Sequence, residues 1–511
     1  MKCHLVLMCV ALIPCANVFA GDDDWETARK EAFDATRYQP DLPDVVAPTD
    51  LDFDAAFGSG GTAVYDFNAA GITRDWGMRT FDRTELIGSV GGIPVFGTFR
   101  YVVGVHWHNG TWDAAVARTD PATGAFETSS IFASGRITVP TTLVEAQDVA
   151  FDGDHRLYFT GQSDLVLFGK AFATYCLDID TGTACTGFAS GSVTGYNYTI
   201  FDVPGGTPNS IARRVVYDPT GYLFVGGESN MLIGKQLALT KINATTGQNV
   251  TSFGVNGNVT YQVLASIDQN VAAMVRRAPD GPGLDLLYVG GAFQRSTSDY
   301  DGYISAINPA SGAIQSTVAA FYEDDNTGFK KDSVNAISVL ANGKLAFVGS
   351  SDTDHVGVPS LLLGRINSLA AGLSYDTSFC GSGRCAWSNF GLLGSFANAA
   401  PIAIAERPGN RDLVISMQGN SFAIGTPQVI RVEQYSANGT MYRIGKEISV
   451  QGNGTNTTWA GPGLEVDDKY VTVTGTRLWG PTIKDDVDFV VARLQANDSI
   501  FADRFGGPHG D

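Results

Sequence analysis

Three short phrases recur in a fixed order along most of this chain of 511 residues. The first is a polar or acidic residue, two spacers, Phe and a Gly-rich turn, as in "LDFDAAFGSGG" at 51–61. The second is an apolar run, a turn and a second apolar run that closes on a small residue, as in "VVYDPTGYLFVGG" at 215–227. The third is a single strand-like run, as in "QLALTKIN" at 236–243. Such repetition predicts one supersecondary unit that is used many times.

The spacing of the first phrase indicates how many units there are. Its equivalent positions are Phe57, Phe132, Phe188, Phe253, Phe321, Phe379, Ile444 and Phe505, with a degraded turn at Phe321 and Ile444. The first and last lie 448 residues apart, so the seven intervals average 64 residues. Each interval holds about four short strands, which is typical of a propeller blade, whereas the coils of a β-solenoid are usually shorter. We therefore predict an all-β fold, a single antiparallel propeller of seven blades.

The two ends of the repeat complement each other. The first copy continues into the strand-like "TAVYDF" at 62–67 with no hairpin before it, and the last copy stops at "FGGPHGD" with no strand after it. An open blade would leave a sheet edge unpaired, which invites aggregation. We predict that 62–67 closes the ring by pairing with strands inside 463–500.

The segment before the repeats has a different character. Residues 1–20 have one Lys, an apolar run and a small-x-small ending at Ala20, which predicts a signal peptide and an exported protein. A lipoprotein signal at Cys15 is the alternative, but Pro14 fits such a signal poorly. Residues 21–50 predict a short acidic helix followed by a Pro-rich linker. The expected organisation is therefore 1–20 leader, 21–50 extension, 51–507 propeller and 508–511 tail.

The net charge limits the partners that we expect, and the cysteine content predicts disulfides. The net charge of −19 argues against nucleic acid and anionic membrane surfaces, and no apolar run after the leader is long enough to span a bilayer. The four cysteines outside the leader form two close pairs, which predict the disulfides Cys176–Cys185 and Cys380–Cys385. Neither pair suits zinc, no cofactor motif is present, and we expect a monomer without a cofactor.

The combined phrases "LDxxFGxxG", "apolar–DGK–apolar–VGG" and "LAxxRhN" resemble the delta-60 repeat β-propeller family. The resemblance covers about 51–507 and is clearest at 204–263 and 332–383. It implies an exported, mostly bacterial propeller, and it implies no shared set of catalytic residues.

One local feature suggests a ligand site. His106, Trp107 and His108 are followed by Trp112, and the two His residues of a strand would point to one face. They could hold a metal while the tryptophans stack on a sugar, or they could simply cap the end of a hairpin. The acidic cluster of Asp485, Asp486 and Asp488 is interpreted as a solvated loop.

Catalytic motifs such as HExxH and GxSxG are absent from the sequence. We therefore expect an exported scaffold that binds a protein or glycan through one face. The alternative is a carbohydrate-active lyase or hydrolase with its site at the mouth of the central channel.

Overall fold

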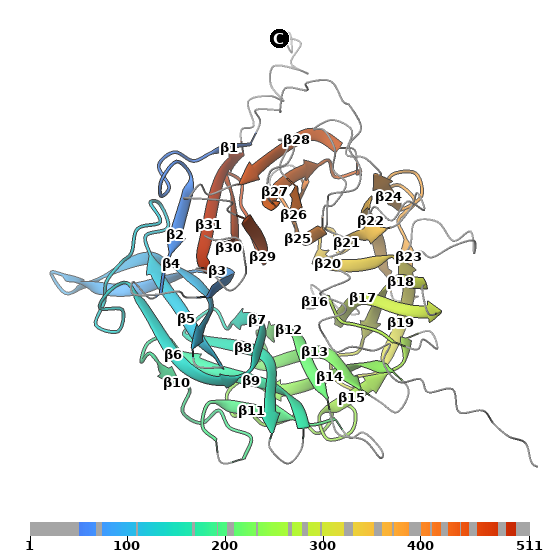
Figure 1. The fold of residues 1–511 in the computed structure, drawn as a ribbon, viewed down its shortest axis with the longest axis horizontal. Helices are drawn as coiled ribbons and strands as arrows, with labels where there is room; N and C mark the ends of the chain where they lie inside the picture. Colours follow the sequence, from blue (N-terminus) through green and yellow to red (C-terminus); the bar gives the residue numbers. More distant parts are fainter. Residues whose placement is uncertain are drawn as a thin grey trace, which may run out of the picture.

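The chain folds into seven small sheets arranged in a ring, as predicted (Figure 1). The computed structural model describes residues 51–67, 74–108, 111–165, 169–191, 193–201, 209–230, 234–263, 268–277, 285–296, 299–320, 331–351, 360–369, 372–387, 400–408, 411–420, 428–439, 441–448, 457–478 and 487–496. The leader, the expected helix and linker of 21–50, and the tail lie outside the described residues. Within these ranges, no helix is long and apolar enough to cross a membrane.

Blades 1 to 3 follow one another along the chain. Blade 1 contains β3 (Asp75–Val90), β4 (Ile93–His108), β5 (Thr111–Thr119) and β6 (Arg136–Leu143). Blade 2 contains β7 (Glu145–Phe151), β8 (Arg156–Leu165), β9 (Gly169–Asp178), β10 (Thr183–Ala184) and β11 (Tyr196–Thr199). Blade 3 contains β12 (Ser210–Asp218), β13 (Tyr222–Asn230), β14 (Lys235–Asn243) and β15 (Asn258–Tyr261).

Blades 4 to 7 complete the ring. Blade 4 contains β16 (Ala273–Arg277), β17 (Leu286–Ser296), β18 (Asp299–Ile307) and β19 (Ile314–Ala320). Blade 5 contains β20 (Ser333–Val339), β21 (Leu345–Ser351), β22 (Ser360–Leu369), β23 (Gly372–Tyr375) and β24 (Arg384–Trp387). Blade 6 contains β25 (Ala400–Glu406), β26 (Leu413–Asn420), β27 (Gln428–Tyr435) and β28 (Met441–Ile448). Blade 7 contains β29 (Thr457–Val466), β30 (Tyr470–Leu478) and β31 (Val487–Ala496), together with β1 (Leu51–Phe53) and β2 (Thr62–Tyr65).

The two ends of the described chain meet in blade 7, which confirms the predicted closure. Strand β2 pairs antiparallel with β31, in the register Thr62 to Ala492 and Tyr65 to Phe489. Strand β1, which the sequence analysis did not expect, pairs with the far end of the same strand, Leu51 opposite Ala496. The turn around Phe57 connects β1 to β2, so both short strands pair with the same long strand, β31.

The second phrase closes on Gly because the first strand of most blades bulges toward it. In six blades the pairing of the first and second strands shifts by one or two extra residues near the start of the first strand. A Cβ atom at Gly227 would lie 1.9 Å from the carbonyl oxygen of Ile211, and one at Gly349 would lie 1.7 Å from that of Ser333. Gly104 and Gly161 meet the first strands of their blades at 1.8–2.0 Å, and Gly291 meets Asn270, just before the first strand of blade 4, at 2.1 Å. Only Gly allows this approach.

The first phrase joins each blade to the next. Phe57, Phe188, Phe253 and Phe379 are fully buried. The residue after each donates its backbone N–H to a carbonyl oxygen in the turn of the next blade, at 2.7–3.2 Å from Thr123, Thr246, Ser311 and Asn438 respectively. The repeat motif therefore serves the joints between blades.

The basic residue of the third phrase contributes to the same joints. Lys241 donates to the carbonyl oxygen of Pro309 at 2.9 Å, and Arg365 and Arg493 donate to those of Ala437 and Pro121. Each of these carbonyl groups belongs to the next blade around the ring. The basic side chain of the third phrase therefore links neighbouring blades.

Both predicted disulfides are present. The Cα atoms of Cys176 and Cys185 lie 5.4 Å apart, and those of Cys380 and Cys385 lie 5.8 Å apart. Each bridge closes a local loop, of nine and five residues in sequence, inside a single blade. The two disulfides therefore constrain local turns within a blade and do not link one blade to another.

Candidate functional site

The seam between blade 7 and blade 1 gathers ionisable side chains from distant parts of the chain. Asp75, His106 and Asp113 lie opposite one another on β3, β4 and β5 of blade 1. Arg477 and Asp488 form the equivalent cross-strand pair on β30 and β31 of blade 7. A parallel bridge between Arg74 and Val487 joins the two blades at this level.

His106 and Asp75 form the centre of this group. The Nδ1 atom of His106 lies 2.5 Å from Oδ1 of Asp75, and the backbone N–H of Phe67 donates to Oδ2 of Asp75 at 3.0 Å. Asp75 is wholly buried and His106 is 7% exposed. Burial raises the pKa of Asp75, and the hydrogen bond to Asp75 raises the pKa of His106. The pair therefore holds a shared proton more tightly than isolated groups would.

Two further carboxylates lie beside this pair. One oxygen each of Asp66, Asp75 and Asp488 lie within 4.8 Å of one another. Carboxylate oxygens are the ligands that Ca²⁺ accepts, although that ion takes six to eight of them. Asp488 also receives a hydrogen bond from Arg477 at 2.9 Å, so part of the negative charge is compensated by protein.

These acidic residues correct one interpretation of the sequence. Asp488 was grouped with Asp485 and Asp486 as a solvated loop, but it is 2% exposed. It lies inside β31, where the pairing with β30 turns its side chain toward Arg477. Sequence spacing could not reveal this, because two of its neighbours, Asp66 and Asp75, come from the other end of the chain.

Three tryptophans cluster on the opposite face of blade 1, where Trp76 and Trp112 pack against a core shared with blade 2. The ring centroids of Trp107 and Trp112 lie 5.0 Å apart, and those of Trp76 and Trp112 lie 6.4 Å apart, both in edge-to-face contact. Trp107 and Trp112 are opposite partners on β4 and β5, near the end of that hairpin. All three rings are only partly buried.

The structure brings together most of the residues that the sequence singled out. His106, Trp107 and Trp112 lie on one hairpin end, which agrees with both the site and the capping interpretation. The backbone of His108 pairs with Thr111, while its side chain lies outside the described side chains. Asp66, Asp75, Asp113 and Arg477 were missed, and Asp488 was assigned to a solvated loop. Of these, only Asp113 had a local signal, its expected position opposite His106 across the "HNG" turn.

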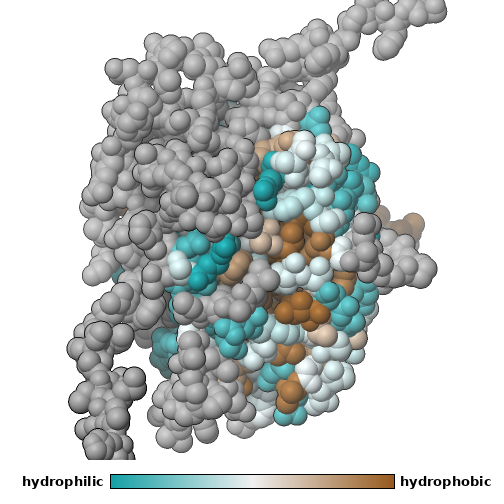
Figure 2. Space-filling view, turned by 90° about the vertical axis from the view of Figure 1, so that its right-hand side faces the viewer, coloured by the Kyte–Doolittle hydropathy of each residue, from teal (hydrophilic) through white to brown (hydrophobic). Residues whose placement is uncertain are grey.

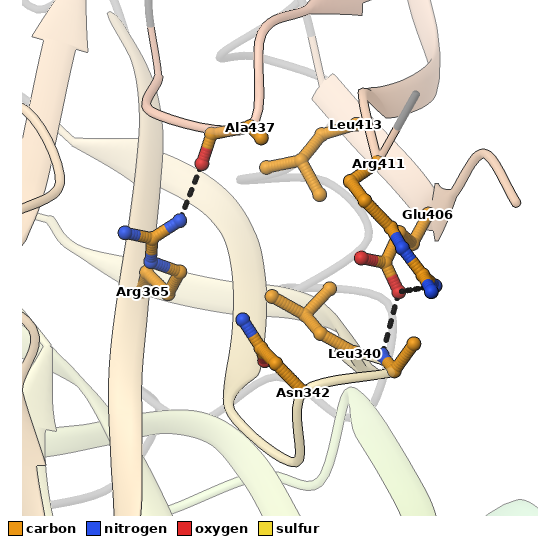
Figure 3. A pocket seen from close by; sticks show the side chains of 8 residues that line it. Leu340, Asn342, Arg365, Glu406, Arg411, Leu413 and Ala437 are labelled. Carbon is orange, nitrogen blue, oxygen red and sulfur yellow. Dashed lines mark hydrogen bonds and ion pairs between the residues drawn. The ribbon is translucent and has the colours of Figure 1, made fainter. Parts of the chain in front are cut away.

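A separate cavity of about 320 Å³ opens between blades 5 and 6 (Figure 3). Leu340 and Leu413 line it with Asn342, and Glu406 accepts the backbone N–H of Ala341 at 2.6 Å. Arg365, which also lines the cavity, is one of the basic residues that link neighbouring blades, since it donates to Asp376 at 2.5 Å and to the carbonyl oxygen of Ala437. The polar groups of this cavity thus serve the joint between the blades.

Comparisons with known proteins identify no family for this chain. No protein-family model and no curated protein matches the sequence. Among solved structures, the chain is similar to a quinohemoprotein alcohol dehydrogenase from Pseudomonas putida, with 12% identity, a TM-score of 0.38 and coverage of 80% of this chain and 68% of that one.

Two further solved structures resemble the chain to a similar degree. One is a chain of a Saccharomyces cerevisiae complex of Dbp5 with Nup159 and Gle1, with 10% identity, a TM-score of 0.41 and coverage of 89% and 98% of the two chains. The other is an α-L-arabinofuranosidase from Lactobacillus brevis, with 11% identity, a TM-score of 0.30 and coverage of 56% and 90%. Similarity at this level supports no statement about activity.

Proposed function

We propose that this chain is an exported propeller scaffold that binds a glycan at the tryptophan cluster of blade 1. Export is inferred from the leader at 1–20 and agrees with the two disulfides. The observation that carries the proposal is the cluster of Trp76, Trp107 and Trp112, whose rings are only partly buried. Aromatic rings offer flat apolar faces to sugar rings, and neighbouring polar groups orient the hydroxyls.

The charge of the protein favours a particular class of glycan. The whole chain carries −19, and the opposite face of blade 1 holds the acidic residues Asp75 and Asp113. An acidic polysaccharide would be repelled, so a neutral one is the expected ligand.

Affinity electrophoresis in gels that contain soluble polysaccharides tests this function. A neutral polysaccharide should retard the protein and change its tryptophan fluorescence. Trp107→Ala should weaken binding at least about tenfold, whereas Trp107→Phe should retain most of it because an aromatic face remains. Phe126→Ala is the control, since Phe126 is 39% exposed on blade 1 away from the cluster. Retention that is unchanged in Trp107→Ala would refute the proposal.

A carbohydrate-active lyase or hydrolase is the alternative function. One observation favours it: the carboxylate oxygens lie within 4.8 Å of one another, slightly closer than the carboxyl pairs of retaining glycosidases, which are about 5–5.5 Å apart. Against it, Asp75 is wholly buried and Asp488 is 2% exposed, so neither meets a sugar from solvent. Release of reducing ends or unsaturated products that Asp75→Asn abolishes would favour the enzyme over the binding scaffold.

A further inference from the structure

The hairpin of β3 and β4 extends well beyond the rest of its blade. Both strands are 16 residues long, whereas β5, to which β4 pairs, has nine. Only Arg100–His108 of β4 pairs with β5, so the earlier part of the hairpin stands alone as a two-stranded arm. In Figure 1 this arm leaves the ring on the left, in light blue. We use "arm" for residues 82–99.

Ion pairs at the base hold the arm in place. Arg83 reaches Asp180 of blade 2 at 2.6 Å, and Arg100 bonds Asp82 across the hairpin at 2.7 Å. Arg118 of β5 bonds Glu85 at 3.1 Å. The direction of the arm is therefore set by contacts with two blades, and little freedom is left to lose when it docks.

The tip of the arm exposes large apolar side chains. The exposed fractions are 64% for Leu86, 56% for Ile87, 72% for Val90, 71% for Ile93 and 61% for Phe96. No residue of 86–97 is charged. Their exposed area together is about 600 Å², the size of the largest apolar patch on a typical monomer. On the opposite flank of the ring, apolar side chains reach the described surface in small patches among polar ones (Figure 2).

Both faces of the tip are apolar. Leu86 and Phe96 are opposite partners, as are Val90 and Ile93. Because side chains alternate along a strand, Phe96 and Ile93 point to opposite faces. Ile87 lies on the face of Ile93, since a Cβ atom at Gly97 would lie 3.2 Å from its Cγ2 atom.

We propose that two copies of this chain associate through their arms, as a two-fold pair. The backbone groups along the outer edge of 93–99 have no ladder partner among the strands that the structure describes. Natural proteins protect such edges with charge or Pro, and this one carries no charge and a single Pro, Pro94. A second arm paired along the edge would satisfy these groups, except at Pro94, which has no N–H, and would cover part of the apolar side chains. The exposed apolar area sets a maximum of about 600 Å² from each copy, which corresponds to the lower limit of a specific interface, about 1,200 Å² in total.

Other occupants fit less well. A bilayer would cover the apolar side chains, but it would leave the edge N–H and C=O groups without partners. The body of a second copy offers no comparable socket, because the other strongly exposed large apolar residues in the described ranges, Phe126, Val193 and Val255, come from three different blades. The proposed dimer differs from the monomer expected from the sequence, and its two bodies would be held apart by their arms.

Sedimentation velocity of the purified protein over a range of concentrations tests the dimer. We expect a reversible monomer–dimer equilibrium that strengthens with added salt, because each copy carries −19. Ile93→Lys with Phe96→Lys should weaken the dimer about 100-fold or more, since two anchors are replaced by charges. Val255→Lys is the control: Val255 is 76% exposed but lies outside the arm, so dimerisation should be unaffected.

A second measurement keeps the test independent of folding defects. Ser89→Cys places a thiol near the end of the arm and should be cross-linked between copies by a short bis-maleimide, whereas Ser129→Cys, on blade 1 away from the tip, should not. A protein that stays monomeric, or a dimer that survives Ile93→Lys with Phe96→Lys, would overturn the proposal. Binding of the monomer to phosphatidylcholine vesicles would assign the arm to lipid instead.

Discussion

Arg493 joins three parts of the ring, and removing its partner Asp54 should weaken closure selectively. Its Nε atom bonds Asp54 at 2.7 Å, and its guanidinium also reaches the carbonyl oxygens of Pro121 and Ala122 in blade 1. The side chains of Arg493 and Asp54 are only 7% and 4% exposed. One buried contact thus connects β31, the N-terminal segment and blade 1.

The expected loss of stability follows from the buried charge of Arg493, which is left without its carboxylate partner. Breaking a buried ion pair by removing one partner costs about 3–5 kcal/mol. Arg493 keeps its two carbonyl acceptors and its positions over the rings of Phe57 and Tyr470, at 4.7 and 4.4 Å, so the lower end applies. We expect Asp54→Ala to cost about 3 kcal/mol, and Asp54→Asn about 1 kcal/mol because a neutral acceptor remains. For a unit of this size, 3 kcal/mol lowers Tm by roughly 3 °C.

The neighbouring pair Asp52–Lys446 is the matched control. Its atoms lie 3.4 Å apart, but the side chains are 53% and 28% exposed, so Asp52→Ala should cost less than about 0.5 kcal/mol. Urea titration and thermal scans of the three variants give the comparison. If Asp54→Ala is no more destabilising than Asp52→Ala, the contact between Arg493 and Asp54 does not stabilise the closure of the ring.

The pH dependence gives a second check on the same pair. Burial raises the pKa of Asp54, but the hydrogen bond from Arg493 and the other contacts outweigh this and leave the pKa below 3.8. The stabilisation is therefore present above about pH 4 and is lost as the pH falls through the lower pKa of the folded state. The difference between the wild-type protein and Asp54→Ala should shrink on acidification.

Three further outcomes are expected. Deletion of 51–67 should lower Tm and promote aggregation, because β31 loses both of its outer partners, whereas deletion of 21–45 should do much less. Gly349→Ala should cost about 3 kcal/mol because its Cβ atom would lie 1.7 Å from a carbonyl oxygen, while Gly221→Ala, where the space is open and only the positive φ opposes it, should cost about 1 kcal/mol. Burial raises the pKa of Glu465 to about 7 despite the nearby charge of Arg100, so its contribution to stability should fall as the pH rises from 4.5 through 7, and Glu465→Gln should flatten that part of the Tm profile.

The sequence alone determined the number of blades, the closure by 62–67 and the two disulfides. These depend on local patterns: Phe at regular intervals, a turn within each hairpin, and cysteines a few residues apart. The degraded marker Ile444 was wrong as a turn position, since it lies inside β28, and Phe321 lies outside the described residues. The blade count was still correct because the hairpin phrases between the markers kept their order. A repeated local pattern implies a repeated local structure, and seven copies average out the errors of each one.

Only the tertiary structure decided the candidate site, the second closing strand and the arm. Asp66 and Asp75 meet Asp488 although more than 400 residues separate them, because ring closure brings the first and last blades side by side. No periodicity encodes such a meeting, and the motifs that repetition makes visible are used by the joints between blades. The arm could not be predicted from the sequence either, because its strands look like those of any other hairpin. It is exposed because the pairing with β5 stops where β3 and β4 continue.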